Sequence, residues 1–144
     1  MRQDRWVVVA LVVVGLLVPA CREASSGGAS YEEPAAVEPI EGTDRVRVIL
    51  TEQAAERIDL QTASVESAGN GTQTVIPHAA VFYGLAGETW TYTSPEPLTF
   101  VREPITVDHI DGDLAYLSDG PPVGTEVVTV GAAELFGVET EVGK

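Results

Sequence analysis

Three kinds of hydrophobic pattern follow one another along the chain. Residues 6–18, "WVVVALVVVGLLV", contain no polar side chain. Residues 22–44 are rich in Gly, Ser, Ala, Pro and Glu and show no apolar period. From Arg45 onward, short apolar or alternating runs are separated by Gly, Pro, Asn and Asp. This order predicts an apolar leader, a flexible tether and then a domain built mainly of strands.

The strands are indicated by alternation and by β-branched and aromatic residues. In "RVRVIL" charged and apolar residues alternate, as in a half-buried strand, and in "TWTYTS" Trp90 and Tyr92 face one side while the hydroxyls face the other. In "LQTASVE" we expect Leu60, Thr62 and Val65 to contribute apolar surface. The predicted strands cover residues 45–50, 60–66, 75–83, 89–94, 98–110, 114–120 and 127–130.

Turn residues divide these strands. Asn70-Gly71 is the strongest hairpin dipeptide, and it also begins a glycosylation sequon, "NGT", which we interpret as a turn. Pro77 suits a strand edge or a step between strands, and Pro104 suits a bend. Asp111-Gly112-Asp113 has the composition of a turn between strands.

Two short helices are expected. In "TEQAAERI", Thr51 is a plausible N-cap, Glu52 favours the first turn, and Ala54, Ala55 and Ile58 share one face. "AAELFG" predicts a helical turn that ends on Gly137. The fold class is therefore mainly β: one small barrel-like or sandwich-like domain of six to eight strands, over residues 45–144, with one or two short helices.

The leader ends at the single cysteine of the chain. "MRQDR" is net basic, and the apolar run is shorter than the about 20 residues of a membrane span but fits a secretory signal. Cys21 has no second cysteine with which to form a disulfide, and one alternative is an incidental thiol. "LVPAC" instead resembles a bacterial lipobox, although Pro19 departs from its commonest pattern. The resemblance implies a signal peptide over residues 1–20, lipidation of Cys21 with acyl chains such as palmitate, a tether over 21–44 and a place at the cell membrane, facing the periplasm or the exterior.

The charge excludes some partners. The chain has 22 acidic and 8 basic residues, and 21 acidic and 6 basic residues remain after residue 20. Binding to nucleic acid needs clustered Lys and Arg, so it is excluded, and so is adhesion of the domain to an anionic membrane surface.

Few side chains indicate chemistry. His78 has no recognisable catalytic partner nearby in the sequence, and no phosphate loop, nucleophile elbow or zinc-protease motif is present, so we expect no enzyme, no catalytic residue and no cofactor. A secreted hydrolase would need Ser and His in one motif. The segment "VDHIDGD" leaves open a small-ligand or metal site formed by Asp108, His109, Asp111 and Asp113.

Several segments together resemble one family. They are "VRVILTEQAAERIDLQTASVE", "IPHAAVFYGLAGETWTYTS" and "FVREPITVDHIDGDLAYLSDGPPVGTEVVTVGAAEL". They are similar to the periplasmic adaptor subunits, or membrane fusion proteins, of bacterial efflux pumps. The matching positions are Ile76, Pro77, Trp90, Arg102, Val107, Gly120, Gly124, Val127, Val128, Gly131, Ala132 and Leu135.

The resemblance implies the membrane-proximal part of an adaptor. Full adaptors insert a lipoyl-like domain, a helical hairpin and a β-barrel domain where this chain has only "ESAGNGTQT". The implied role is a lipid-anchored accessory subunit that contacts a membrane transporter of the RND or ABC type, with a homo-oligomer also possible. The expected contact surface is the hairpin Val81–Thr93 together with the loop Ser118–Gly124.

Overall fold

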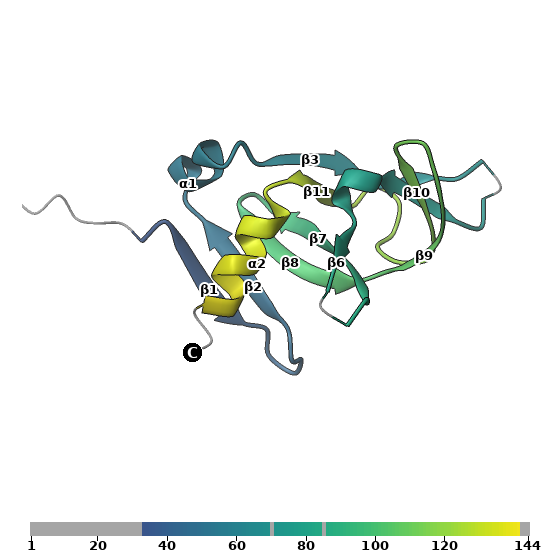
Figure 1. The fold of residues 1–144 in the computed structure, drawn as a ribbon. Coiled ribbons are helices and arrows are strands. Elements are labelled where there is room, and N and C mark those ends of the chain that lie inside the picture. Colours follow the sequence, from purple (N-terminus) through teal and green to yellow (C-terminus); the bar gives the residue numbers. More distant parts are fainter. Residues whose placement is uncertain (1–32, 70, 85, 142–144) are drawn as a thin grey trace, which may run out of the picture. The chain divides into compact units, whose positions relative to one another are not determined.

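Two antiparallel sheets form the folded part of the protein (Figure 1). The structure is a computed structural model, and it describes residues 33–69, 71–84 and 86–141. About half of these residues lie in strands, and the arrangement is sandwich-like without a closed barrel. The prediction of a mainly β domain is confirmed, whereas the expected number of strands was too small, since eleven lie in the described ranges.

The elements follow one another in a fixed order. The helices are α1 (Glu52–Arg57), the 3-10 helix η1 (His78–Ala80) and α2 (Ala132–Glu141). The strands are β1 (Ala35–Pro39), β2 (Val46–Leu50), β3 (Gln61–Ser64), β4 (Glu66–Ser67), β5 (Thr74–Pro77), β6 (Phe82–Tyr83), β7 (Thr89–Glu96), β8 (Thr99–Pro104), β9 (Thr106–Asp111), β10 (Leu114–Asp119) and β11 (Glu126–Val130).

The two sheets differ in size. The seven-stranded sheet has the order β1-β2-β8-β7-β11-β3, with β6 paired to β7, and the four-stranded sheet has the order β4-β5-β10-β9. The chain passes between the sheets at short junctions. Val65 and Ile105 are such junctions, and both are buried. Pro77 ends β5 at the step into η1 and β6, so its predicted place at a step between strands is confirmed.

The first strand lies in the segment that was expected to be tether. β1 pairs with β2 along its whole length, from Ala35 opposite Leu50 to Pro39 opposite Val46. The folded unit therefore begins before Arg45, and the predicted end of the tether at residue 44 is wrong. The composition was misleading because Pro, Ala and Glu are common in tethers, yet here they form an edge strand, where Pro is tolerated.

The first helix forms as its sequence predicts. The Thr51 side chain accepts a hydrogen bond from the backbone N–H of Ala54 at 3.1 Å, which caps the first turn. Ala54, Ala55 and Ile58 pack together against the core of the seven-stranded sheet. The N-cap and the apolar face are both confirmed.

The second helix is longer than predicted. It continues through Gly137 and ends at Glu141, so the predicted end on Gly137 is wrong. Glycine inside a helix costs about 1 kcal/mol relative to alanine. Packing of Phe136 and Val138 against the core, together with the polar contacts of Glu139, offsets this cost.

Two hydrophobic clusters meet at β11. Val127 belongs to the cluster of the four-stranded sheet, with Ile76, Ala115 and Leu117. The next residue, Val128, belongs to the cluster between the seven-stranded sheet and the helices, with members such as Tyr92, Phe100 and Leu135. Successive side chains of a strand point to opposite faces, so β11 contributes to both cores.

Both faces of β7 are covered. Tyr92 is fully buried on one face, and Thr91 and Thr93 are buried on the other. The predicted alternation of rings and hydroxyls along this strand is therefore present, although neither face is open to solvent. In β3, by contrast, Thr62 is exposed, so its predicted contribution to the apolar surface is wrong.

Candidate functional site

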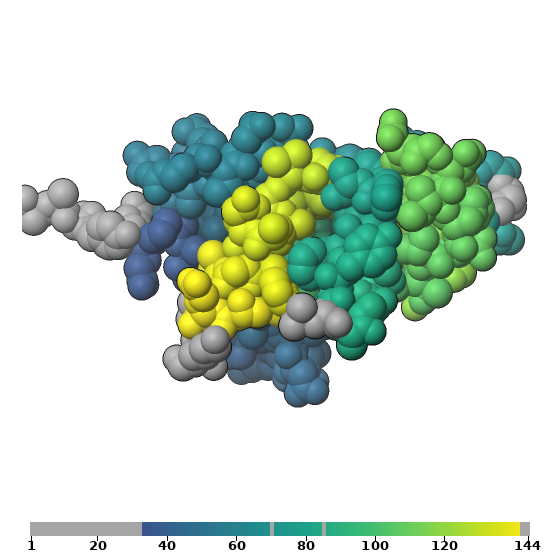
Figure 2. Space-filling view, in the orientation of Figure 1, coloured from purple at the N-terminus to yellow at the C-terminus, as the bar shows by residue number. Residues whose placement is uncertain are grey.

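A shallow hollow lies where the chain steps from the four-stranded sheet to the seven-stranded sheet. It has a volume of about 510 Å³ and is lined by Pro77, His78, Ala79, Val81 and Asp113. The backbone N–H of His78 donates a hydrogen bond to the carbonyl of Asp113 at 2.7 Å, which fixes η1 against the turn between β9 and β10. Figure 2 shows this segment, in teal, at the surface beside the green β9–β10 hairpin.

Tyr83 stands next to this hollow. Its side chain is 54% exposed, and its phenol oxygen lies 3.5 Å from Nε2 of His78. β6 holds Tyr83 in place by pairing with β7, with Phe82 opposite Trp90 and Tyr83 opposite Thr89. We name the surface formed by Tyr83 and the hollow the η1 surface.

The two segments of the expected contact surface are held by different parts of the fold. The hairpin Val81–Thr93 is formed by β6 and β7, and it carries the η1 surface. The loop Ser118–Gly124 is held at its far end, where the N–H of Gly124 donates to the carbonyl of Val65 at 2.9 Å. Val123 in this loop is 58% exposed. The structure thus places exposed apolar groups on both segments.

The outer face of the four-stranded sheet carries a polar and aromatic group that we name the β9–β10 face, formed by Gln73, Asp108, His109, Leu114 and Tyr116. The rings of His109 and Tyr116 are stacked, with centroids 4.4 Å apart and planes 6° from parallel. Asp108 Oδ2 lies 2.8 Å from Nδ1 of His109 and accepts a hydrogen bond from Nε2 of Gln73 at 3.1 Å.

A β-bulge lies next to the stacked pair in β9. His109 is opposite Tyr116, while Val107 is opposite Leu117, so β9 has one extra residue, Asp108, between these pairs. The hydrogen bond from His109, followed by that from Gln73, lowers the pKa of Asp108. The carboxylate is therefore charged at neutral pH and half exposed.

Asp111 and Asp113, the other two residues of the expected ligand site, lie at the turn between β9 and β10. Asp111 pairs with Leu114 at the end of the hairpin, and Gly112 between them has a φ of 58°, which glycine adopts without strain. The predicted turn over residues 111–113 is confirmed. Within residues 33–69, 71–84 and 86–141, no group of three His, Cys, Asp or Glu side chains is placed to hold a metal ion.

A polar cluster under α2 was not predicted. The Tyr92 phenol donates a hydrogen bond to Oε2 of Glu139 at 2.6 Å, and Arg102 pairs with Oε1 of the same carboxylate at 2.9 Å. The Arg102 guanidinium also lies over the Trp90 ring, 4.6 Å from its centroid. Burial, reinforced by Glu139, raises the pKa of Tyr92 strongly. Continuing the helical period past Gly137 would have placed Glu139 on the same face as Leu135 and so indicated this cluster.

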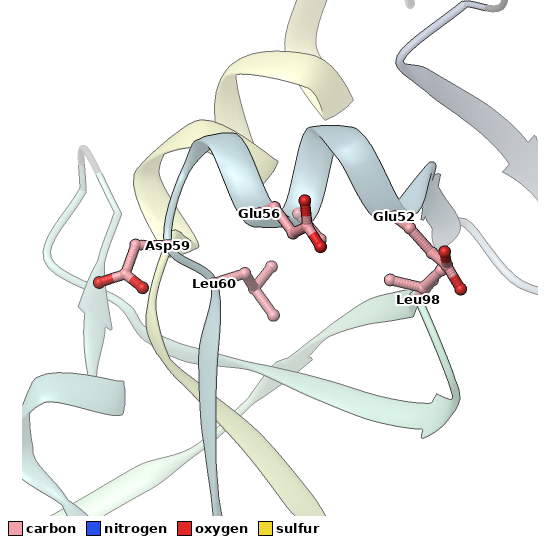
Figure 3. A pocket seen from close by; sticks show the side chains of 6 residues that line it. Glu52, Glu56, Asp59, Leu60 and Leu98 are labelled. Carbon is pink, nitrogen blue, oxygen red and sulfur yellow. The ribbon is translucent and has the colours of Figure 1, made fainter.

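An open acidic hollow lies beside α1. Its volume is about 560 Å³, and Figure 3 shows the carboxylates of Glu52 and Glu56 along the helix, Asp59 after its end, and the apolar side chains of Leu60 and Leu98. The three carboxylates are all exposed at the surface. The hollow is a solvated acidic face.

The expected lipidation site lies outside the described residues. Cys21, the leader over residues 1–20 and the first half of the predicted tether all lie before residue 33, where the described part begins. In the part that the structure describes, no helix is long and apolar enough to cross a membrane.

Comparisons with known proteins give no relative. No protein-family model, no curated protein and no solved structure matches the chain.

Proposed function

We propose that the protein is a lipid-anchored, extracytoplasmic accessory subunit of a membrane efflux or export transporter and acts by protein–protein contact. The observation that carries this proposal is the η1 surface. Tyr83 presents more than half of its area beside a hollow with an apolar part, formed by Pro77, Ala79 and Val81. Exposed tyrosines next to such hollows are typical of protein interfaces, because the ring buries a large area and its hydroxyl still finds a polar partner.

The sequence supplies the second support. "LVPAC" after an apolar run is similar to a lipoprotein signal, and the segments quoted above resemble the membrane-proximal part of an efflux adaptor. A short tether to the membrane raises the effective concentration of the domain near a membrane partner. A modest contact at the η1 surface would then be sufficient for stable association.

Site-specific photo-crosslinking tests the contact. A photoreactive phenylalanine derivative replaces Tyr83 in the full chain, and crosslinked products are recovered from native membranes and identified by mass spectrometry. The same residue at Glu96, an exposed position at the end of β7, is the matched control. We expect a transporter subunit to be crosslinked from position 83 and not from position 96. Equal yields of that subunit from both positions, or its absence from both, would contradict the proposal.

Cys21→Ser tests the anchor separately. In the wild type we expect a mature N-terminus at Cys21 carrying a diacylglycerol thioether, since two acyl chains hold a protein stably at a membrane. The variant should be released or mislocalised, or remain unprocessed and held by its leader, while its β domain stays folded. Mass spectrometry of the membrane-extracted proteins is the measurement. An unmodified thiol on a membrane-bound wild-type protein, or an N-terminus still at Met1, would rule out lipidation.

A further inference from the structure

The β9–β10 face brings a carboxylate and two stacked rings to the surface, outside the residues of the proposed transporter contact. His109 and Asp108 are each 53% exposed at their side chains, and Leu114 at the end of the same face is 41% exposed. Stacked rings and a charged carboxylate thus lie side by side at the surface. An arginine guanidinium suits such a pair, because it stacks flat on an aromatic ring and its N–H fork pairs with a carboxylate.

Charge is divided unevenly between the two sheets. The strands of the four-stranded sheet carry Glu66, Asp108, Asp111 and Asp119 and contain no lysine or arginine. The arginines in the part of the chain that the structure describes, at positions 45, 47, 57 and 102, all belong to the seven-stranded sheet, its connections or α1. The field at the β9–β10 face is therefore negative and complementary to a basic partner.

The arginines of the chain itself are poor candidates for the occupant. Arg45 pairs with Glu103, Arg47 with Glu38 and Arg102 with Glu139. Three of the four described arginines would have to break these pairs to reach a second copy of this domain, and the fourth, Arg57, lies in the last turn of α1 and not in an extended segment. β9 is also the last strand in the order of its sheet, so an extended segment has room to lie along it.

We propose that the β9–β10 face binds an extended, arginine-bearing segment of a partner protein. A guanidinium of the segment stacks on the His109–Tyr116 pair and forms an ion pair with Asp108. This surface adjoins the η1 surface, since Leu114 is opposite Pro77, but the two share no residue. Variants at Asp108 and Tyr83 therefore test the two contacts separately.

Peptide titration of the full chain in detergent micelles tests the proposal. The probe is a short peptide with arginine at alternate positions, and the matched probe carries citrulline, which has nearly the same shape and no charge. We expect the arginine peptide to bind, the citrulline peptide to fail, and a lysine peptide to bind more weakly because an ammonium does not stack as a flat group. In ¹⁵N NMR spectra the shifts should be confined to residues 73–75 and 106–119.

Variants of the protein identify the contact. Asp108→Asn and Tyr116→Leu should each lower the affinity for the arginine peptide about two- to fivefold, the range for exposed cation–aromatic and ionic contacts. Glu96→Gln removes the same charge elsewhere, and Tyr83→Leu removes an exposed ring elsewhere, so neither should change the affinity. Asp108→Asn preserves the size of an exposed side chain, so it still tests the contact if Tyr116→Leu unfolds the protein.

Three results would overturn the proposal. Equal weakening by Glu96→Gln and Asp108→Asn would mean that only net charge attracts the peptide. Equal binding of the citrulline peptide would show that the charged guanidinium is not recognised. Saturable binding of Mg²⁺ or Ca²⁺ alone, with loss on Asp108→Asn, would assign the face to a cation instead.

Discussion

The two sheets are stabilised and exposed in different ways. The seven-stranded sheet is covered by α1 and α2, and its ionic groups are largely tied in pairs, with Glu139 shared between Tyr92 and Arg102. The four-stranded sheet packs one face on its cluster and leaves the His109–Tyr116 stack at the surface. The first region therefore holds its polar cluster under a helix, whereas the second holds its polar and aromatic groups at the surface.

The largest effects should come from truncation of the two cores. Phe100 is 2% exposed and Leu117 is 1% exposed. We expect Phe100→Ala to lower the free energy of unfolding by about 3–5 kcal/mol and Leu117→Ala by about 2–5 kcal/mol. Because Val127 and Val128 join the clusters, both variants should shift one cooperative transition, measured by urea unfolding and by hydrogen exchange of β8 and β10. Val130→Ala, at a position 39% exposed, is the control. If only β10 exchanges faster in Leu117→Ala, while β8 stays protected, the two sheets unfold independently.

A smaller effect is expected at the polar cluster under α2. Tyr92→Phe removes the hydrogen bond to the Glu139 carboxylate and should lower the free energy of unfolding by about 1.5–3 kcal/mol. The raised pKa of Tyr92 favours the protonated phenol in the folded state. Its contribution is complete below the unfolded pKa of about 10 and is lost as the pH rises above that value. The free energy of unfolding of the wild type should thus fall more at alkaline pH than that of Tyr92→Phe. Urea unfolding over that pH range is the measurement. If Tyr83→Phe, at an exposed position, has the same effect, the interpretation is wrong.

The smallest effect is expected on the β9–β10 face. Hydrogen bonds lower the pKa of Asp108, so its contribution to stability is present above the unfolded pKa of about 3.9 and is lost as the pH falls through the folded value. Asp108→Asn should be close to wild type at neutral pH and should lose less stability on acidification. Thermal unfolding at pH 7 and below pH 4 is the measurement. A large loss at neutral pH would show that this face is structural, which would remove the contrast with the seven-stranded sheet.

Local signals predicted most of the strands, because alternation and turn residues act over a few neighbours. Thr51, for example, identified the start of α1 from its own side chain. β1 was missed because its composition resembles that of a tether, although its partner β2 is the next strand along the chain. The last turn of α2 was missed because Tyr92 and Arg102, which contact Glu139, are distant in the sequence.

The candidate surfaces were predicted only in part. Asp108 and His109 are neighbours in the sequence, so their contact could be anticipated. The stack on Tyr116 follows from the turn, because the register runs unbroken from Asp111 opposite Leu114 to His109 opposite Tyr116. The bulge at Asp108 comes after these pairs, and no sequence pattern in this hairpin indicates it.

The place of β11 near the end of the chain has a consequence for the order of assembly. Val127 is the last residue of one cluster, Val128 and the later Leu135 belong to the other, and β11 joins β3 to β7 within the seven-stranded sheet. During synthesis, neither core can close before residue 128 has emerged and found these distant strands. If the leader directs export in an unfolded form, as proposed above, this late closure would keep both cores open until the segment that includes β11 has passed.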